Sequence, residues 1–334
     1  MSEARVLSIN ELQLEFPVYG GSVRALNRVS LQVNAGEIVG VVGESGSGKS
    51  VTAMMAMRLL AEDGYRVTGG ELEILGIDVL AASERQMRQL RGARVSMIFQ
   101  EPMSALNPTR KIGRQMCEVI RLHQRLSAQA ARGKAVRLLQ EMQIADADRV
   151  MERYPFELSG GMRQRVLIAM AFSCEPELII ADEPTTALDV TVQRQVLRLL
   201  QQKARASGTA VLFITHDMAV VSQLCDRVYV MYAGHVIESG ATAAVINRPA
   251  HPYSIGLLQA APERAAPREP LQAVPGTVPN LSALPPGCAF SNRCRHADGQ
   301  CRQTPALTPL AEDAQRRAAC WHPQQVNLEV CDEH

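Results

Sequence analysis

The 334-residue sequence has few aromatic residues, no excess of either charge and no long run of apolar residues. Phe, Trp and Tyr together make up 4% of the chain, too few to suggest the stacking platforms that bind single-stranded nucleic acids. The formal net charge of +1 argues against a basic DNA- or RNA-binding footprint and against attraction to an anionic membrane surface. We therefore expect no nucleic-acid partner.

No apolar run approaches the roughly 20 residues that a membrane-spanning helix requires. The first six residues, MSEARV, also lack the basic start and apolar core of a signal peptide. These absences predict a cytosolic protein that reaches a membrane only through a partner. An apolar fraction of 46% is ample for a core, and the length suits one large domain or two smaller ones.

The stretch GESGSGKS at residues 43–50 fits the phosphate-binding pattern G-x-x-x-x-G-K-[ST]. It follows an apolar run at 37–42 that predicts a buried parallel strand, and it precedes an apolar stretch at 51–57 that predicts a helix. Lys49 is expected to reach the β- and γ-phosphates, and Ser50 to bind the Mg²⁺ that bridges them. The residues of this predicted ATP-binding loop are Gly43, Glu44, Ser45, Gly46, Ser47, Gly48, Lys49 and Ser50.

Alternating apolar residues predict two strands before this loop, within 6–16 and 26–33, joined by a glycine turn. Phe16 and Tyr19 are the aromatic residues available to stack on a purine ring, although an ordinary strand role suits each equally well. Residues 111–175 have helical periodicity throughout, which predicts a helical subdomain inserted into a sheet domain. Further strands are expected at 71–75, 95–99, 178–181, 210–214, 228–232 and 235–238, and further helices at 191–206 and 252–260.

Asp182 and Glu183 end a predicted strand of four apolar residues. In a nucleotide-phosphate site this is the place of the carboxylate that binds Mg²⁺, so Asp182 is expected on the metal. Glu183 is expected to orient or deprotonate a water aimed at the γ-phosphate. An acid in such a loop can also cap a helix, but the upstream phosphate loop favours the nucleotide role. His216 also follows a predicted strand, where a lone histidine is more often structural than catalytic.

Together these motifs resemble those of the ATP-binding subunits of ABC transporters, in their order and spacing. The matching segments are GESGSGKS at 43–50, Gln100, LSGGMRQ at 158–164, LIIADEP at 178–184, ALD at 187–189 and His216. The resemblance implies an α/β fold: a RecA-like ABC nucleotide-binding domain with an N-terminal antiparallel β-subdomain and an inserted α-helical subdomain. An irregular C-terminal extension rich in Cys and Pro follows. The expected division is 1–248 and 249–334, with the helical subdomain at about 101–175.

The resemblance also implies roles for the matching residues. Gln100 would touch Mg²⁺ or the attacking water, and His216 would hold the γ-phosphate beside the general base Glu183. The ATP of an opposing subunit would be contacted by Ser159, Gly160, Gly161, Gln164 and Asp189. Because Lys49, Asp182, Glu183 and His216 are all intact, a non-catalytic cassette is not favoured.

Four other segments resemble the oligopeptide and dipeptide importers: FQEPMSALNP at 99–108, HPY at 251–253, PGTVP at 275–279 and GCAF at 287–290. The whole chain most resembles ATPase subunits of D,D-dipeptide (D-alanyl-D-alanine) permeases. This implies an ATPase, peripheral at the cytoplasmic face of the bacterial inner membrane, that energises import of di- or oligopeptides. Its partners would be two integral membrane permease subunits, a second related ATPase subunit in a heterodimer and, indirectly, a periplasmic peptide-binding protein. The alternative is a soluble ABC ATPase of DNA repair or translation, for which no fused cassette, coiled-coil insertion or basic surface is visible.

Five of the eight cysteines fall in the last 50 residues, where proline is also frequent. Because disulfides are disfavoured in a reducing cytosol, this clustering suggests metal. The spacings among Cys288, Cys294, Cys301 and Cys320 match neither the usual zinc pairs nor the common ferredoxin patterns, so spacing leaves both groups open. The resemblance to peptide-importer ATPases implies a [4Fe–4S] cluster on these four cysteines, with Cys331 outside the set and zinc as the alternative.

Overall fold

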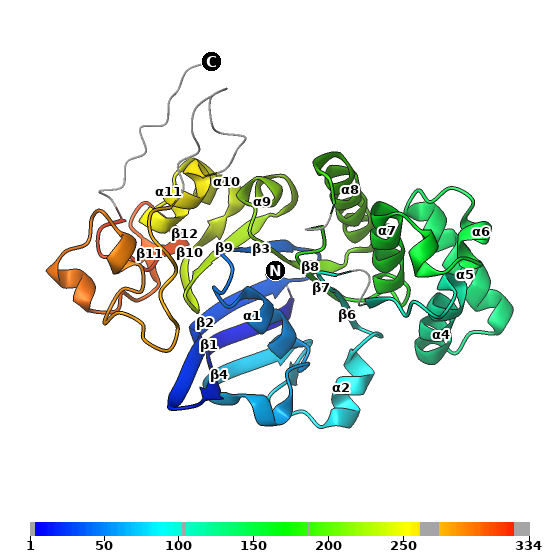
Figure 1. Ribbon diagram of the computed structural model, residues 1–334, viewed down its shortest axis with the longest axis horizontal. Coiled ribbons are helices and arrows are strands. Elements are labelled where there is room, and N and C mark those ends of the chain that lie inside the picture. Colours follow the sequence, from blue (N-terminus) through cyan, green and yellow to red (C-terminus); the bar gives the residue numbers. More distant parts are fainter. Residues whose placement is uncertain (1–3, 102–104, 186–187, 261–273, 324–334) are drawn as a thin grey trace, which may run out of the picture. The chain divides into compact units, whose positions relative to one another are not determined.

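The computed structural model describes residues 4–101, 105–185, 188–260 and 274–323, coloured along the chain in Figure 1. The chain forms two compact units. The first comprises Met1–Leu7, Val33–Glu37 and Ile74–Ile214, and the second comprises Ser8–Gln32, Ile38–Glu73 and Thr215–His334. Among the described helices, none is both long and apolar enough to cross a membrane.

The first unit contains three parallel strands in the order β8-β7-β6. They are β6 (Val95–Ile98), β7 (Leu178–Asp182) and β8 (Ala210–Thr215). Every residue of β7 and β8 is buried, as expected for continuous apolar runs in a parallel sheet that is covered on both faces. The pairing of Ile98 with Ala181 brings the carboxyl ends of β6 and β7 out at the same edge.

The helical block predicted at 111–175 is confirmed. It consists of α4 (Ile112–Gln124), α5 (Ala128–Glu141), α6 (Ala147–Met151), the 3₁₀ turn Pro155–Glu157 and α7 (Gly160–Ala171), drawn together in green in Figure 1. Ile112, Met116 and Ile120 are fully buried at a spacing of four, so one face of α4 packs into the block. The unit also contains α2 (Glu84–Leu90), α8 (Val190–Ser207) and the two-residue strand β5 (Ile77–Asp78).

In the second unit, the predicted N-terminal strands form an antiparallel layer in the order β2-β1-β4. They are β1 (Arg5–Val18), β2 (Gly21–Asn34) and β4 (Arg66–Ile74). Leu12 and Leu14 of β1 are buried while the residues between and beside them are more exposed, which is the alternation seen in the sequence. Gly20 turns the chain between β1 and β2 with φ of 84°, a conformation that favours glycine.

The same unit carries five more strands in the order β11-β12-β10-β9-β3. They are β3 (Ile38–Val42), β9 (Arg227–Tyr232), β10 (His235–Ala241), β11 (Thr308–Leu310) and β12 (Asp313–Ala318). Only β3 and β9 pair in parallel, and the pairs β9–β10, β10–β12 and β11–β12 are antiparallel. The helices of this unit are α1 (Lys49–Ala56), α9 (Met218–Leu224), α10 (Thr242–Asn247) and α11 (Pro252–Gln259), with 3₁₀ turns at Glu62–Gly64, Ser291–Arg293 and Gly299–Arg302.

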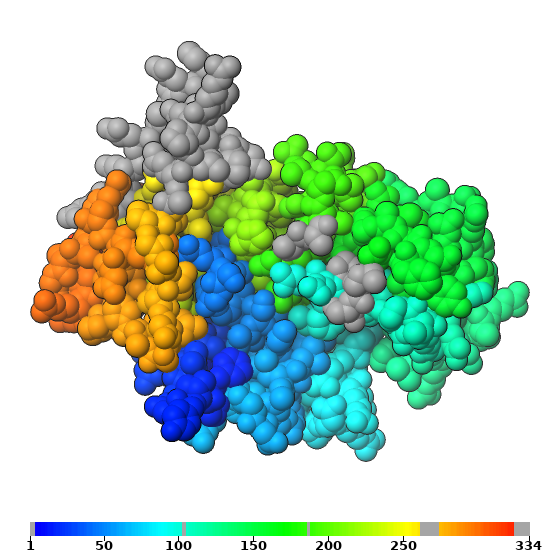
Figure 2. Space-filling view, in the orientation of Figure 1, coloured from blue at the N-terminus to red at the C-terminus, as the bar shows by residue number. Residues whose placement is uncertain are grey.

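The described part of the C-terminal extension includes the strands β11 and β12 between irregular segments. The backbone pairing of Glu238 with Ala318 attaches β12 to β10. Beside this pairing, the buried carboxylate of Glu238 lies 3.6 Å from Arg316. The β12 sequence, DAQRRA, carries no strand-forming apolar residue, so its alternation could not be seen beforehand. Residues 274–323 of the extension form the orange to red-orange part of the surface in Figure 2.

Candidate nucleotide site and cysteine pocket

The predicted site residues fall into two sets, one in each unit. The phosphate loop, His216 and the cysteine-rich extension belong to the second unit. Gln100, Asp182, Glu183, the LSGGMRQ segment and Asp189 belong to the first.

The phosphate loop connects β3 to α1, as the sequence predicts. Gly43 cannot carry a side chain, because a Cβ there would lie 2.1 Å from the Met231 carbonyl oxygen. Gly48 is the N-cap of α1 with φ of 102°, and its Cβ would lie 2.8 Å from the Ala25 carbonyl oxygen. The glycines are therefore required by close backbone packing and, at Gly48, by a left-handed conformation. A helix start facing this loop is a ready anion site.

Lys49 is the cation of this loop. Its side chain is buried, and its ammonium group donates to the carbonyl oxygens of Gly43 at 2.7 Å and Glu44 at 3.0 Å. Both acceptors belong to the loop itself, so the positive charge is held inside its curve. Ser50 follows, half-buried in the first turn of α1.

In the first unit, two of the predicted catalytic residues are in contact. The Gln100 side-chain amide donates to Glu183 Oε2 at 3.2 Å. Gln100 follows β6 and Glu183 follows β7, so the shared sheet edge explains the contact. Glu183 has φ of 45°, a left-handed conformation that is costly for a residue with a side chain and that recurs at functional sites. Asp182, the last residue of β7, is buried.

The LSGGMRQ segment begins α7. Ser159 is the N-cap, and its hydroxyl accepts a hydrogen bond from the Met162 N–H at 3.3 Å. Ser159 and Gly160 are exposed, which leaves this helix start open to a ligand. Gln164 is fully buried instead, and neither atom of its amide has a hydrogen-bond partner among the described residues. Asp189 is exposed and caps α8 by accepting from the Val192 N–H at 2.9 Å.

The remaining predicted residues of the second unit lie at or near the surface. Tyr19 is fully exposed in the β1–β2 turn, whereas Phe16 is half-buried in β1. His216 is exposed and directly precedes Asp217, the N-cap of α9. The stacking role of Phe16 or Tyr19 and the γ-phosphate role of His216 stay predictions.

All four of the predicted cysteine ligands line one pocket of the second unit, together with aromatic and imidazole side chains. Its lining consists of His251, Pro252, Cys288, Phe290, Ser291, Cys294, His296, Cys301, Cys320, Trp321 and His322. The room between the side chains is about 20 Å³, with further space open to solvent. Cys331 lies outside the described residues.

The environment of these thiols has two opposing features. Burial, reinforced by the neighbouring cysteines, raises the pKa of Cys320 to about 11. Burial likewise raises the pKa of Cys288 and of Cys294. On the other hand, backbone N–H groups point at the sulfurs: His296 N–H at Cys294 Sγ and His322 N–H at Cys320 Sγ, each at 3.4 Å. Such donors stabilise a thiolate that binds a metal.

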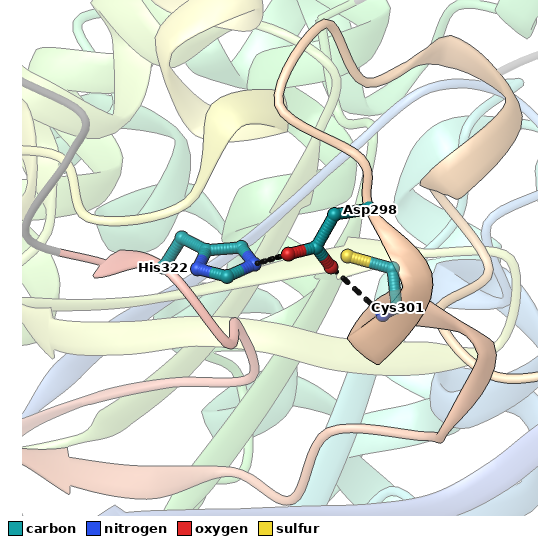
Figure 3. A group of neighbouring side chains, drawn as sticks. All are labelled: Asp298, Cys301 and His322. Atoms are coloured by element: carbon teal, nitrogen blue, oxygen red, sulfur yellow. Dashed lines mark hydrogen bonds and ion pairs between the residues drawn. The ribbon is translucent and has the colours of Figure 1, made fainter.

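A smaller group of possible metal ligands adjoins one of these cysteines. Asp298, Cys301 and His322 place their ligand atoms within 4.8 Å of one another (Figure 3). His322 Nε2 lies 3.1 Å from Asp298 Oδ2, and Asp298 Oδ1 accepts from the Cys301 N–H at 3.3 Å. This carboxylate therefore already has partners, which an N-cap role at the Gly299–Arg302 turn explains.

Two residues that the sequence did not single out for the nucleotide site touch its loop. Arg293 binds the Glu44 carboxylate, and the Tyr253 hydroxyl accepts from the Glu44 N–H at 2.7 Å. Both come from the C-terminal extension, about 200 residues or more along the chain. Tyr253 belongs to the HPY segment, which was noticed only as a mark of resemblance.

Comparisons with known proteins agree with these observations. A family model described as "ABC transporter" matches residues 26–186, and one described as "Oligopeptide/dipeptide transporter, C-terminal region" matches residues 237–301. Among solved structures, the ATP-binding cassette MJ0796 in a dimeric post-hydrolysis state with ADP and Pi is 26% identical with a TM-score of 0.63. That match covers 71% of this chain and 98% of the cassette.

Curated relatives match along almost the whole chain. The probable D,D-dipeptide transport ATP-binding protein DdpD of Escherichia coli is 69% identical, covering 97% of this chain and 99% of that protein. The oligopeptide transport protein OppD of E. coli is 46% identical, with coverages of 95% and 93%. The dipeptide transport protein DppD of E. coli is 44% identical, with coverages of 95% and 97%.

Proposed function

Because this chain belongs to the ATP-binding subunits of oligopeptide and dipeptide ABC transporters, we propose that it hydrolyses MgATP to drive peptide import. The observation that carries the proposal is the 69% identity over 97% of the chain, which includes the C-terminal extension. A soluble ABC ATPase of DNA repair or translation is disfavoured, since the relatives above are named for transport.

Lys49 and the loop N–H groups would hold the phosphates, with Ser50, Gln100 and Asp182 around Mg²⁺. Glu183 would accept the proton of the attacking water, and its contact with Gln100 at 3.2 Å supports a shared role at that water. His216 would bind the γ-phosphate, and Phe16 or Tyr19 would stack on the adenine.

A second ATPase subunit would complete the site. The exposed Ser159 and Gly160 at the start of α7, with Gly161, are suited to the γ-phosphate of a partner's ATP, and Asp189 would lie at the same interface. Gln164 is proposed for the same interface; its amide is buried and has no hydrogen-bond partner among the described residues. A related but different subunit is the expected partner.

The assembly would include two permease subunits in the inner membrane, with this subunit peripheral on the cytoplasmic face. A periplasmic peptide-binding protein would deliver the substrate, and a D,D-dipeptide is proposed from the likeness to DdpD. Within the chain, we propose an ATPase domain at 1–248 with helices inserted at about 101–175. Residues 249–334 would form an extension, and the break near 248 follows the end of α10 at Asn247.

The extension would hold a metal group on Cys288, Cys294, Cys301 and Cys320. A tetrahedral zinc with Zn–S bonds of about 2.3 Å would hold its sulfurs about 3.8 Å apart. Among the described residues, the group of potential ligands within 4.8 Å of each other includes only Cys301 of the four. The backbone N–H donors at Cys294 and Cys320 suit thiolates bound to either group, and the resemblance to peptide-importer ATPases is what favours a [4Fe–4S] cluster, which would supply a structural cross-link of four thiolates.

Reconstitution of the transporter tests the function. The complex of this subunit with its permeases is placed in proteoliposomes with the binding protein, and ATP hydrolysis is measured with D-alanyl-D-alanine or L-alanyl-L-alanine. We expect hydrolysis to be stimulated by the D,D-dipeptide and to be lost with Lys49→Ala. Stimulation by the L,L-dipeptide alone would contradict the proposed substrate, and hydrolysis that survives Lys49→Ala would contradict the proposed site.

A further inference from the structure

Glu44, inside the phosphate loop, is held by the C-terminal extension through both its side chain and its backbone. Arg293 Nη1 donates to Glu44 Oε2 at 2.7 Å, and Arg293 Nη2 donates to Oε1 at 3.1 Å. The Glu44 N–H donates to the Tyr253 hydroxyl at 2.7 Å. Two parallel bonds from one guanidinium to one carboxylate are strong and fix orientation as well as distance. The loop residue is therefore tied to the extension at two points.

Arg293 has little freedom of its own. Its side chain is 4% exposed. Nε donates to the Pro275 carbonyl at 2.7 Å, Nη2 also donates to the Val274 carbonyl at 3.1 Å, and Nη1 to the Tyr232 hydroxyl at 3.3 Å. With the two bonds to Glu44, these contacts use the whole rigid fork of donors. A shift of the backbone at Arg293 is therefore passed to Glu44 instead of being absorbed by the side chain.

That backbone lies between two lining residues of the cysteine pocket. Arg293 ends the 3₁₀ turn Ser291–Arg293, which separates Cys288 from Cys294. The Ser291 N–H donates to the Cys288 carbonyl at 3.0 Å, and the Cys294 N–H donates to the Ser291 carbonyl at 3.3 Å. The same short turn thus sets the separation of the two cysteines and the position of Arg293.

At its other end the contact reaches Lys49, the lysine of the phosphate loop. The Glu44 carbonyl oxygen accepts from the Lys49 ammonium group at 3.0 Å. Continuous contacts therefore run from the pocket through Arg293 and Glu44 to the group that meets the phosphates. A purely structural alternative exists, in which the Arg293–Glu44 pair only anchors the extension to the unit.

We propose that Arg293 is a positioning residue for the phosphate loop and that it couples the content of the cysteine pocket to MgATP binding. The inference rests on the proposed ATP-binding function and adds a regulatory contact to it. By linkage, a group in the pocket that improves MgATP affinity is itself bound more tightly when MgATP is present, by the same factor. Loss of the group would loosen the loop.

The first experiment measures the dissociation constant of MgATP for the full-length protein carrying Arg293→Met, Glu44→Ala or both. We expect each single variant to weaken binding about tenfold, within the usual range for coupled sites. The double variant should be no weaker than either single one, because both remove the same contact. Arg293→Lys, which keeps the charge but not the fork, should recover only part of the loss. Fully additive effects, or affinities equal to wild type, would overturn the proposal.

Two controls separate positioning from folding. Arg295→Met removes an exposed arginine two residues away, whose side chain contacts His296, and should leave MgATP affinity unchanged. Glu44→Ala acts from the loop side and leaves the bonds from Arg293 to Pro275, Val274 and Tyr232 in place. If Glu44→Ala lowers only the unfolding temperature and not the affinity, the contact is an anchor and the proposal is wrong.

The second experiment tests the link to the pocket. Cys294→Ser is made alone and with Arg293→Met, and iron, zinc and MgATP affinity are measured on the same anaerobic samples. Cys294→Ser alone should weaken MgATP binding, whereas Cys294→Ser combined with Arg293→Met should bind MgATP no more weakly than Arg293→Met alone. If Cys294→Ser alone leaves the MgATP affinity unchanged, the coupling is refuted. Lys49→Ala distinguishes failure of the proposed function from failure of this inference. If the Lys49→Ala protein binds MgATP as wild type does, the proposed function fails. If only Lys49→Ala loses binding while the Arg293 and Glu44 variants match wild type, the inference alone fails.

Discussion

Single residues at the β6–β7 edge illustrate how far residue types predict chemistry. The sequence placed Gln100 and Glu183 at the ends of two strands, and the structure joins their side chains at 3.2 Å. Parallel neighbours expose their carboxyl ends at one edge, so the pairing of β6 with β7 explains the contact, although the sequence did not predict that pairing. The left-handed backbone of Glu183 could not be foreseen, because residue type alone does not reveal a φ of 45° at a glutamate.

Glu183→Gln should separate chemistry from binding. The amide keeps the size of the side chain but cannot accept the proton of the attacking water, so hydrolysis should fall about 10²–10⁴-fold while MgATP still binds. Turnover by the reconstituted transporter and nucleotide affinity are measured together. Glu177→Gln, at the exposed start of the same strand region and paired with Arg94, is the matched control. Turnover of Glu183→Gln within a few-fold of wild type would refute its role as the base.

At the scale of the elements, buried apolar runs and helix caps were the signals that worked. The runs that became β3, β7 and β8 were read correctly because parallel strands are covered on both faces. A cap pattern for α7 is also present in the sequence, where Ser159 precedes two glycines, and the structure places Ser159 at the N-cap of the helix. Strand β12 was missed, because Asp313–Ala318 offers mostly polar residues and gains its place from pairing with β10.

Ser159→Arg should block hydrolysis without affecting nucleotide binding by the isolated subunit. A bulky cation at the exposed start of α7 would obstruct the approach of a second subunit's nucleotide, whereas the phosphate loop of the same chain is unchanged. Loss of the cap also costs about 1 kcal/mol of stability. Ser127→Arg is the matched control, since Ser127 caps α5 in the same way through the Ala130 N–H. Binding by the monomer and turnover by the complex are compared.

If Ser159→Arg reduces MgATP affinity of the isolated subunit as severely as Lys49→Ala does, the role across the interface is wrong. The same holds if Ser127→Arg abolishes turnover to the same extent, because a lost cap would then explain both variants.

At the scale of the whole molecule, the sequence predicted an ATPase region and a C-terminal extension, but it did not predict the contacts that join the extension to the phosphate loop. Motifs, composition and cysteine crowding pointed to an ATPase region and an extension. These patterns gave no reason to expect that a change in the extension affects MgATP binding. The hydrogen bonds that join Arg293 and Tyr253 to Glu44 supply such a reason. Such contacts join residues more than 200 positions apart, and no local pattern records them.

The four-cysteine pocket leads to the last prediction. Protein purified without exposure to air should be brown, with broad absorption near about 400 nm and bound iron, as expected for an iron–sulfur cluster on four thiolates. Cys294→Ser should remove the colour and the iron, because the three remaining cysteines would hold the group poorly. Residues 274–323 should also become more accessible to protease. Cys117→Ser, at a half-buried cysteine of α4 in the first unit, should keep both colour and iron. Stoichiometric zinc without iron in the anaerobic protein would instead assign the pocket to a zinc ion.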